Sequence, residues 1–141
     1  MKIKKRIYLL QFLFVLYSNL LMAQSQSVAD KNLTWFSRQN IEMHSGMTME
    51  TEAKIATKGR QTIELTVQGQ VMSFKIQTVT GTWENENLDG KLIYAVLYNT
   101  VDTGKITIER TSGNPKITID FTETNADGMH QEFTITSIET N

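Results

Sequence analysis

Residues 62–77 read TIELTVQGQVMSFKIQ, and this stretch decides the fold. Up to residue 67, apolar and polar side chains alternate in steps of two. After Gly69 the same alternation returns as Met72, Phe74 and Ile76. A period of two is the spacing of a β-strand with one buried and one solvated face. Two such runs joined by a short turn that contains glycine predict an antiparallel hairpin.

The same design repeats along most of the chain. Further alternating runs occupy 47–56, 104–111, 115–123 and 129–138. Between runs stand turn residues such as Asp89-Gly90, which favour tight hairpins because both residue types tolerate positive φ. Short strands every ~8–12 residues, with no helical period between them, predict an all-β antiparallel meander of about eight strands.

Eight strands suit either an up-and-down barrel or a two-sheet sandwich. Sandwiches of the Greek-key type need at least one long crossing connection, whereas the links here are short, so the barrel is favoured. The outward positions carry Glu, Lys, Gln and Thr rather than an apolar band, which argues against a membrane barrel of the porin type.

The first residues have the pattern of an export signal. Four basic residues stand within the first six positions, and a mostly apolar run follows over 7–21. Ala23-Gln24-Ser25 then gives the small-x-small pattern that signal peptidases cleave. We expect residues 1–23 to be a signal peptide, with position 25 as the alternative cleavage site. The apolar run is shorter than the ~20 residues of a spanning helix, so we expect no stable membrane span.

Composition narrows the class of protein. The chain contains no cysteine, so disulfides, thiolate metal sites, cysteine nucleophiles and a lipid anchor on cysteine are excluded. The short lysine-rich head is typical of bacterial export, which predicts a secreted, periplasmic or extracellular protein. Beyond that head the chain carries ten basic and fifteen acidic residues. A body of that charge lacks the basic stripe of nucleic-acid-binding proteins, so we expect no nucleic-acid partner.

The N-terminal segment 24–40 is ambiguous. Asp30 would cap a short helix that places Leu33 and Phe36 on one face. Alternatively, Leu33 and Trp35 begin an extra edge strand. Residues 41–141 are expected to form a single β domain after this segment.

The strand predicted at 91–99 breaks the pattern, because both of its faces are apolar. One face holds Leu92, Tyr94, Val96 and Tyr98, and the other holds Ile93, Ala95 and Leu97. A half-exposed antiparallel strand should have one polar face, so something covers the second one. The candidates are Trp35, Phe36 or another element of the chain, a partner protein or second copy of the chain bound through strand 91–99, or a ligand against the tyrosines.

Residues that carry chemistry are few. The two histidines, His44 and His130, each stand beside a predicted turn, where we expect solvated turn residues; as an alternative, a meander could bring them together at one end of the barrel with Glu42 or Glu132. Nothing at metal-ligand spacing surrounds them, so we expect no metal and no cofactor. The chain also lacks a Gly-x-Ser-x-Gly elbow or any other catalytic motif, which argues against an enzyme.

Two classes of function remain. The first is an exported, non-enzymatic binding protein, a small β-barrel that holds a small apolar or amphipathic ligand. The alternative is a protein-binding module of the cell envelope: an inhibitor, an immunity protein or a subunit of a surface assembly. An interior cavity would favour the first, and a filled core with an exposed apolar patch the second. The predicted ligand- or partner-binding residues are Trp35, Trp83, Tyr94, Leu97 and Tyr98.

Overall fold

The structure, a computed structural model, describes residues 26–121 and 129–141; the expected signal peptide lies outside these residues. The described chain begins with a 3-10 helix, η1 (Val28–Asp30), and is otherwise built from strands. These strands are β1 (Asn32–Glu42), β2 (Met47–Met49), β3 (Ala53–Lys58), β4 (Thr62–Val67), β5 (Gln70–Thr82), β6 (Gly90–Tyr98), β7 (Asp102–Arg110), β8 (Lys116–Asp120) and β9 (His130–Thr140). The prediction of an all-β antiparallel fold is therefore confirmed.

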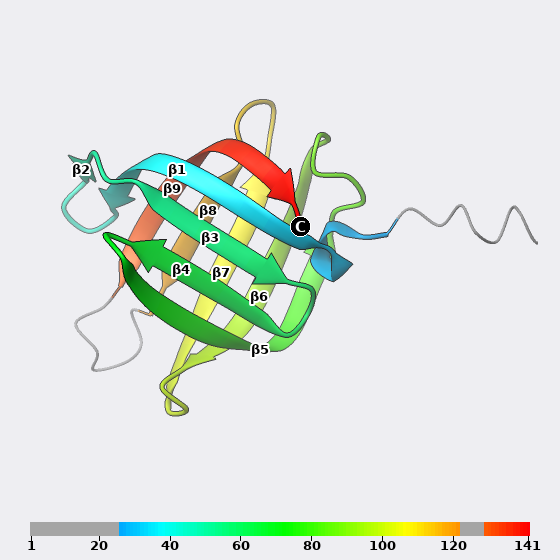
Figure 1. Ribbon diagram of the computed structural model, residues 1–141, viewed down its shortest axis with the longest axis horizontal. Coiled ribbons are helices and arrows are strands. Elements are labelled where there is room, and N and C mark those ends of the chain that lie inside the picture. The colour runs from blue at the N-terminus through cyan, green and yellow to red at the C-terminus, as the bar shows by residue number, and fades with distance from the viewer. Residues whose placement is uncertain (1–25, 122–128) are drawn as a thin grey trace, which may run out of the picture.

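The strands close into a barrel (Figure 1). Each of the strands β3 to β8 pairs with the next one in the chain, and β1 pairs with β3 on one side and with β9 on the other. Eight strands thus form the closed wall, while β2 adds a short extra strand beside the end of β1. Because the first and last strands pair, the barrel is the correct choice over the sandwich.

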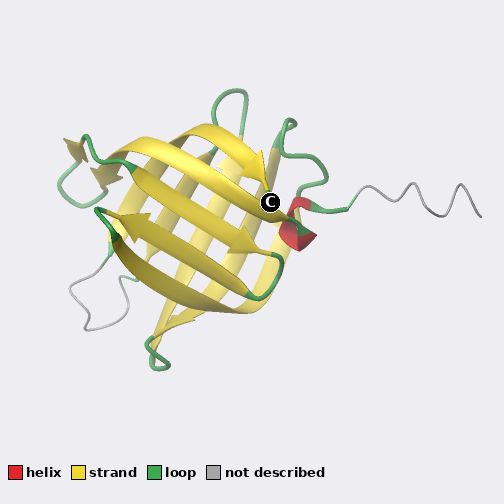
Figure 2. Cartoon of the chain, viewed as in Figure 1, coloured by secondary structure: helices red, strands yellow, loops and turns green. Residues whose placement is uncertain are grey.

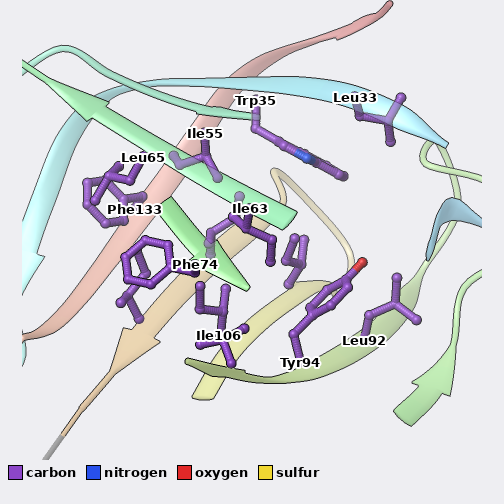
Figure 3. Close-up of a cluster of buried hydrophobic side chains, with 14 of the residues drawn as sticks. Leu33, Trp35, Ile55, Ile63, Leu65, Phe74, Leu92, Tyr94, Ile106 and Phe133 are labelled. Atoms are coloured by element: carbon purple, nitrogen blue, oxygen red, sulfur yellow. The ribbon is translucent and has the colours of Figure 1, made fainter. Parts of the chain in front are cut away.

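Alternating apolar side chains fill the interior of the barrel (Figure 3). Ile55, Ile63, Phe74 and Ile106 come from four different strands, and each has an exposed fraction of 0%. Large and β-branched residues suit such inward positions because they pack well on a pleated surface. Within the described residues, no helix is long and apolar enough to cross a membrane.

The N-terminal segment forms a strand where the sequence left a helix or a strand open: Leu33 and Phe36 lie in β1, and the helix that Asp30 would cap is not formed, because the 3-10 helix η1 ends at Asp30. Ser27 caps η1 by accepting a hydrogen bond from the Ala29 amide. The short helix lies at one end of the barrel (Figure 2), and its Val28 and Ala29 are buried there. The following strand, β1, is not an edge strand but a full member of the wall. Its inner face carries Leu33 and Trp35, both with an exposed fraction of 0%.

The two ends of the barrel are built differently. We call the end with η1, the loop 83–89 and the turn 111–115 the helix end. The turns between β1 and β2, β4 and β5, and β6 and β7 lie at the other end, which we call the Tyr98 end (Figure 1).

A β-bulge near the middle of β1 changes which residues face the interior. Ser37 pairs with Ile135 and Asn40 with Phe133, so β1 has one more residue between these pairs than β9 has. The Ser37 hydroxyl holds this bulge by donating to the Gln39 carbonyl at 2.7 Å and accepting from the Gln39 amide at 3.3 Å. Uninterrupted alternation would turn Gln39 inward; the bulge turns Asn40 inward instead.

Candidate functional site

Trp35 and Trp83, both predicted to bind a ligand or partner, lie together at the helix end. Their ring centroids are 5.8 Å apart, and both side chains are almost wholly buried. Each indole N–H has a partner: that of Trp35 donates to Thr57 Oγ1 at 3.3 Å, and that of Trp83 donates to the Leu88 carbonyl at 3.0 Å. Both rings therefore pack the core, and both indole donors are already used within the protein.

Tyr94 also faces the interior, in the part of the core shown in Figure 3. Burial raises the pKa of its phenol to about 12, although the nearby Arg60 guanidinium lowers it in part. The phenol is thus protonated at every physiological pH. The structure therefore places Tyr94 in the core with Trp35 and Trp83, rather than on a surface.

Tyr98 belongs to a second aromatic group at the Tyr98 end. Its ring lies 5.5 Å from that of Phe74 and 6.3 Å from that of Phe121, and it is only partly buried. Gly104 makes room for this group, because a Cβ at position 104 would come within 2.5 Å of the Phe121 ring. Tyr98, one of the residues predicted to bind a ligand or partner, thus reaches both the core and the barrel opening.

Leu97 lies on the outer face of β6 with Ile93 and Ala95, and all three are half-buried. The prediction that Trp35 or Phe36 covers this face is wrong, because Trp35 is inside the barrel and β1 is not a neighbour of β6. The polar strands on either side shield it in part, with Lys75 and Thr103 directly opposite Leu97. An oligomer through strand 91–99 stays a prediction.

Further apolar side chains gather with Tyr98 at its end of the barrel. Val67, Met72 and Met129 are partly buried and pack against the edge of the core. Two of the three are methionines, whose flexible and polarisable side chains adapt to irregular surfaces. This group, which we call the apolar wall, consists of Val67, Met72, Tyr98 and Met129.

Polar side chains face the interior on the β1–β9 side of the same end. Asn40 has an exposed fraction of 5%, and its Nδ2 donates to Gln131 Oε1 at 3.0 Å. Its Oδ1 is buried and has no hydrogen-bond partner among the described residues. The pairing of Glu42 with Gln131 places this carboxylate on the same side, nearer the rim. We call Asn40, Glu42 and Gln131 the polar wall.

Sequence reasoning missed Asn40 because a period-two pattern carries no sign of a bulge. Regular alternation from Leu33 and Trp35 assigns Asn40 to the solvent face, where an asparagine needs no explanation. Only the paired register of β1 and β9 reveals its inward position. Gln131 was missed for a related reason. The strand at 129–138 is predicted from its apolar residues alone, and these do not indicate that a polar side chain such as Gln131 also faces inward.

The two histidines meet, which the sequence left open as an alternative. The rings of His44 and His130 stack with centroids 4.8 Å apart, and His130 Nδ1 lies 3.3 Å from Asp120 Oδ1. Pairing of His130 with Asp120 puts this group on the outer side of the wall, because the neighbouring Ile119 faces inward. Glu132 pairs with Lys116 instead, at 2.8 Å. Among the described residues, no group of three or more His, Asp or Glu side chains is placed to hold a metal ion.

Glu42 shapes the turn that carries His44. Its carboxylate accepts hydrogen bonds from the backbone amides of His44 and Ser45 and from the Ser45 hydroxyl. These bonds, the hydroxyl first, lower the pKa of Glu42 to about 2. The rim of the polar wall is therefore negatively charged at any physiological pH.

A separate hollow of about 740 Å³ lies on the outer surface, where β1 bulges away from β3. Half-buried Phe36 contributes to its lining, together with hydroxyl and charged side chains from β1, β3, β9 and the β2–β3 link. The charged members are Arg38, Glu50, Glu52, Lys54 and Glu139. We call this hollow the Phe36 groove.

Comparison with protein-family models, curated proteins and solved structures finds no match to this chain. Function is therefore inferred from the chain's own residues and geometry.

Proposed function

We propose that this is an exported, non-enzymatic binding protein that takes a small amphipathic ligand at the Tyr98 end of its barrel. The observation that carries the proposal is the two-sided lining of that end. The apolar wall stands on β4, β5, β6 and the residue before β9, and the polar wall stands on β1 and β9. Because apolar side chains fill the barrel interior, the ligand would bind at the mouth of the barrel by displacing half-buried side chains, and would not occupy a preformed interior cavity. A ligand with an apolar body and a polar group would meet matching chemistry on both sides of that mouth.

The contrast with the helix end supports this choice of entrance. There, η1 fills the barrel opening, and the Val28 amide donates to the Trp83 carbonyl at 2.8 Å. A ligand entering at that end would have to displace buried side chains and break this bond. At the Tyr98 end it would displace only half-buried side chains, two of them flexible methionines.

Native mass spectrometry of the protein recovered from an export host tests the proposal directly. We expect a bound small molecule, or a 1:1 complex with added 1-dodecanol. Met72→Ala should weaken dodecanol binding about five-fold, because roughly 1 kcal/mol of apolar contact is lost. Val71→Ala is the matched control, since Val71 is the preceding residue of β5 and points to solvent with an exposed fraction of 62%. Equal effects of the two variants, or no binding at all, would count against the proposal.

A protein-binding module is the second candidate, and the Phe36 groove favours it. A half-buried aromatic side chain within a charged and polar rim resembles the anatomy of a protein interface. Phe36→Asp should then abolish a complex that Val101→Asp, at an exposed turn tip, leaves intact. A bound protein that survives Phe36→Asp in native mass spectra would exclude this groove as its docking site.

A further inference from the structure

Asn40 identifies the kind of polar group that the ligand must carry. We infer that the Tyr98 end selects neutral amphiphiles with a hydrogen-bond donor, such as a hydroxyl or an amide N–H, which binds Asn40 Oδ1. This inference rests on the proposed function and deepens it, because it adds a chemical class to the ligand.

The hydrogen-bonding capacity of Asn40 is only partly used. Its amide nitrogen is occupied by Gln131 Oε1 at 3.0 Å, whereas Oδ1 meets no donor from the described part of the chain. A buried acceptor without a donor is unfavourable, since it loses its bonds to water and gains none. Native structures keep such a group where something else supplies the donor, and a ligand hydroxyl or amide would do so.

Asn40 Oδ1 faces the interior of the barrel. Asn40 is paired with Phe133, and Gln131 with Ile119; both partners point into the core. Oδ1 is therefore on the inner side of the wall, at the same end as Tyr98 and Met129. A donor bound there would leave the apolar remainder of the ligand on the side of the apolar wall.

The charge at this end of the barrel disfavours anionic ligands. Glu42, two residues beyond Asn40, is an anion because its pKa is about 2. Among the described residues, the buried polar side chains are Thr34, Ser37, Asn40 and Thr57, and none of them is basic. A fatty carboxylate or a phosphate would thus face a negative rim, with no buried cation from these residues to balance it, which disfavours anionic ligands.

A matched series of probes separates these ideas by isothermal titration calorimetry at pH 7. The probes are 1-dodecanol, dodecyl methyl ether and dodecanoate, which share a chain and differ in the head group. We expect the alcohol to bind about ten-fold more tightly than the ether, because only the alcohol donates a hydrogen bond. The carboxylate should bind more weakly than the alcohol.

Asn40→Leu should abolish the difference between alcohol and ether, since it removes the acceptor but keeps the volume. Gln39→Leu is the matched control: it makes the same amide-to-leucine change at the adjacent, exposed position, and should preserve the ten-fold preference. The ratio measured in the natural protein does not depend on how well either variant folds, so it tests the inference alone.

Several results would overturn the inference. Equal binding of alcohol and ether by the natural protein would mean that Oδ1 is satisfied by a structural water, not by a ligand. A preference for dodecanoate, or a preference for alcohol that survives Asn40→Leu, would equally reject it. Binding of all three probes without discrimination rejects only the inference, whereas failure of every probe to bind rejects the proposed function.

Discussion

The helix end and the Tyr98 end share one barrel wall but are stabilised in different ways. At the helix end, Lys31 and Glu86 form an ion pair at 2.7 Å, and Arg110 donates to the Glu86 carbonyl at 2.8 Å. At the Tyr98 end, Thr100 occupies the left-handed region with φ of +64°, and Asn40 Oδ1 has no partner among the residues that the structure describes. A β-branched residue at positive φ is strained, and a buried lone acceptor is unfavourable.

This difference indicates a division of labour. Residues that hold a fold together are selected for packing and satisfied polar groups, whereas binding surfaces keep unfavourable features that a ligand relieves. We therefore expect substitutions at the helix end to cost stability, and some substitutions at the Tyr98 end to increase it.

The largest effect is expected from Trp83→Ala. Trp83 has an exposed fraction of 2% and is covered by η1, so its loss should lower the free energy of unfolding by about 3–5 kcal/mol. Tyr98→Ala, at the other end, should cost only about 1–2 kcal/mol, because the ring is partly exposed and less burial is lost. Urea unfolding followed by far-ultraviolet circular dichroism measures both. Equal losses would contradict the contrast between the ends.

Asn40→Leu should raise the free energy of unfolding by about 1 kcal/mol while it removes a binding group. The gain comes from exchanging an unsatisfied buried amide oxygen for an apolar group of similar size. Gln39→Leu, on the solvent side of the bulge, should change stability by less than about 0.5 kcal/mol. A loss of stability in Asn40→Leu would show that the hydrogen bond to Gln131 outweighs the orphaned oxygen.

Thr100→Gly should stabilise the protein by up to about 1 kcal/mol, because both central residues of this turn have positive φ. With the substitution positions 99 and 100 read Asn-Gly, two residue types that tolerate positive φ. Thr103→Gly, in regular strand β7, should instead lose about 0.5–1 kcal/mol. Thermal unfolding of the two variants checks the prediction. A gain in both, or a loss in both, would mean that turn strain is not what distinguishes position 100.

The smallest effect is expected on the way in which stability depends on pH through Glu42. The folded pKa of Glu42, about 2, lies below its ordinary value of 4.5, so its stabilising contribution is complete above pH 4.5 and disappears as the pH falls toward 2. Glu42→Gln should therefore be less stable than the natural protein at pH 7, and the difference should shrink as the pH falls through that window. Glu50→Gln, at an exposed position, serves as the control. A difference that does not depend on pH would rule out the carboxylate as its origin.

Much of the fold was predictable from the sequence because period-two alternation reports burial directly. Ile63, Leu65 and Phe74 follow that alternation without interruption, and all three face the interior as the alternation predicts. The closure of β1 onto β9 was favoured but not determined, since pairing between strands about 100 residues apart leaves no local pattern. Every second turn of a meander lies at the same barrel end, which allowed His44 and His130 to meet, but only the pairing of β1 with β9 puts them side by side.

The candidate site was predictable only in part. Large aromatic residues were chosen as binding residues, but size favours burial as much as binding, and Trp35, Trp83 and Tyr94 are in the core. Tyr98 lies at the proposed entrance because its strand ends there. Asn40 was not predicted at all, because a local bulge, rather than the overall alternation, turns it inward.

The pairing of β1 with β9 also has a consequence for how the chain folds. Leu33 is opposite Thr140, and the Asn141 amide donates to the Asn32 carbonyl, so the wall closes only when the last strand is in place. Until then, β1 and β8 each present an unpaired edge to other chains. Folding therefore depends on contacts between distant parts of the chain, which predicts slow closure and a partly folded state prone to aggregation. In the proposed export, such a delay would keep the chain unfolded while it crosses the membrane.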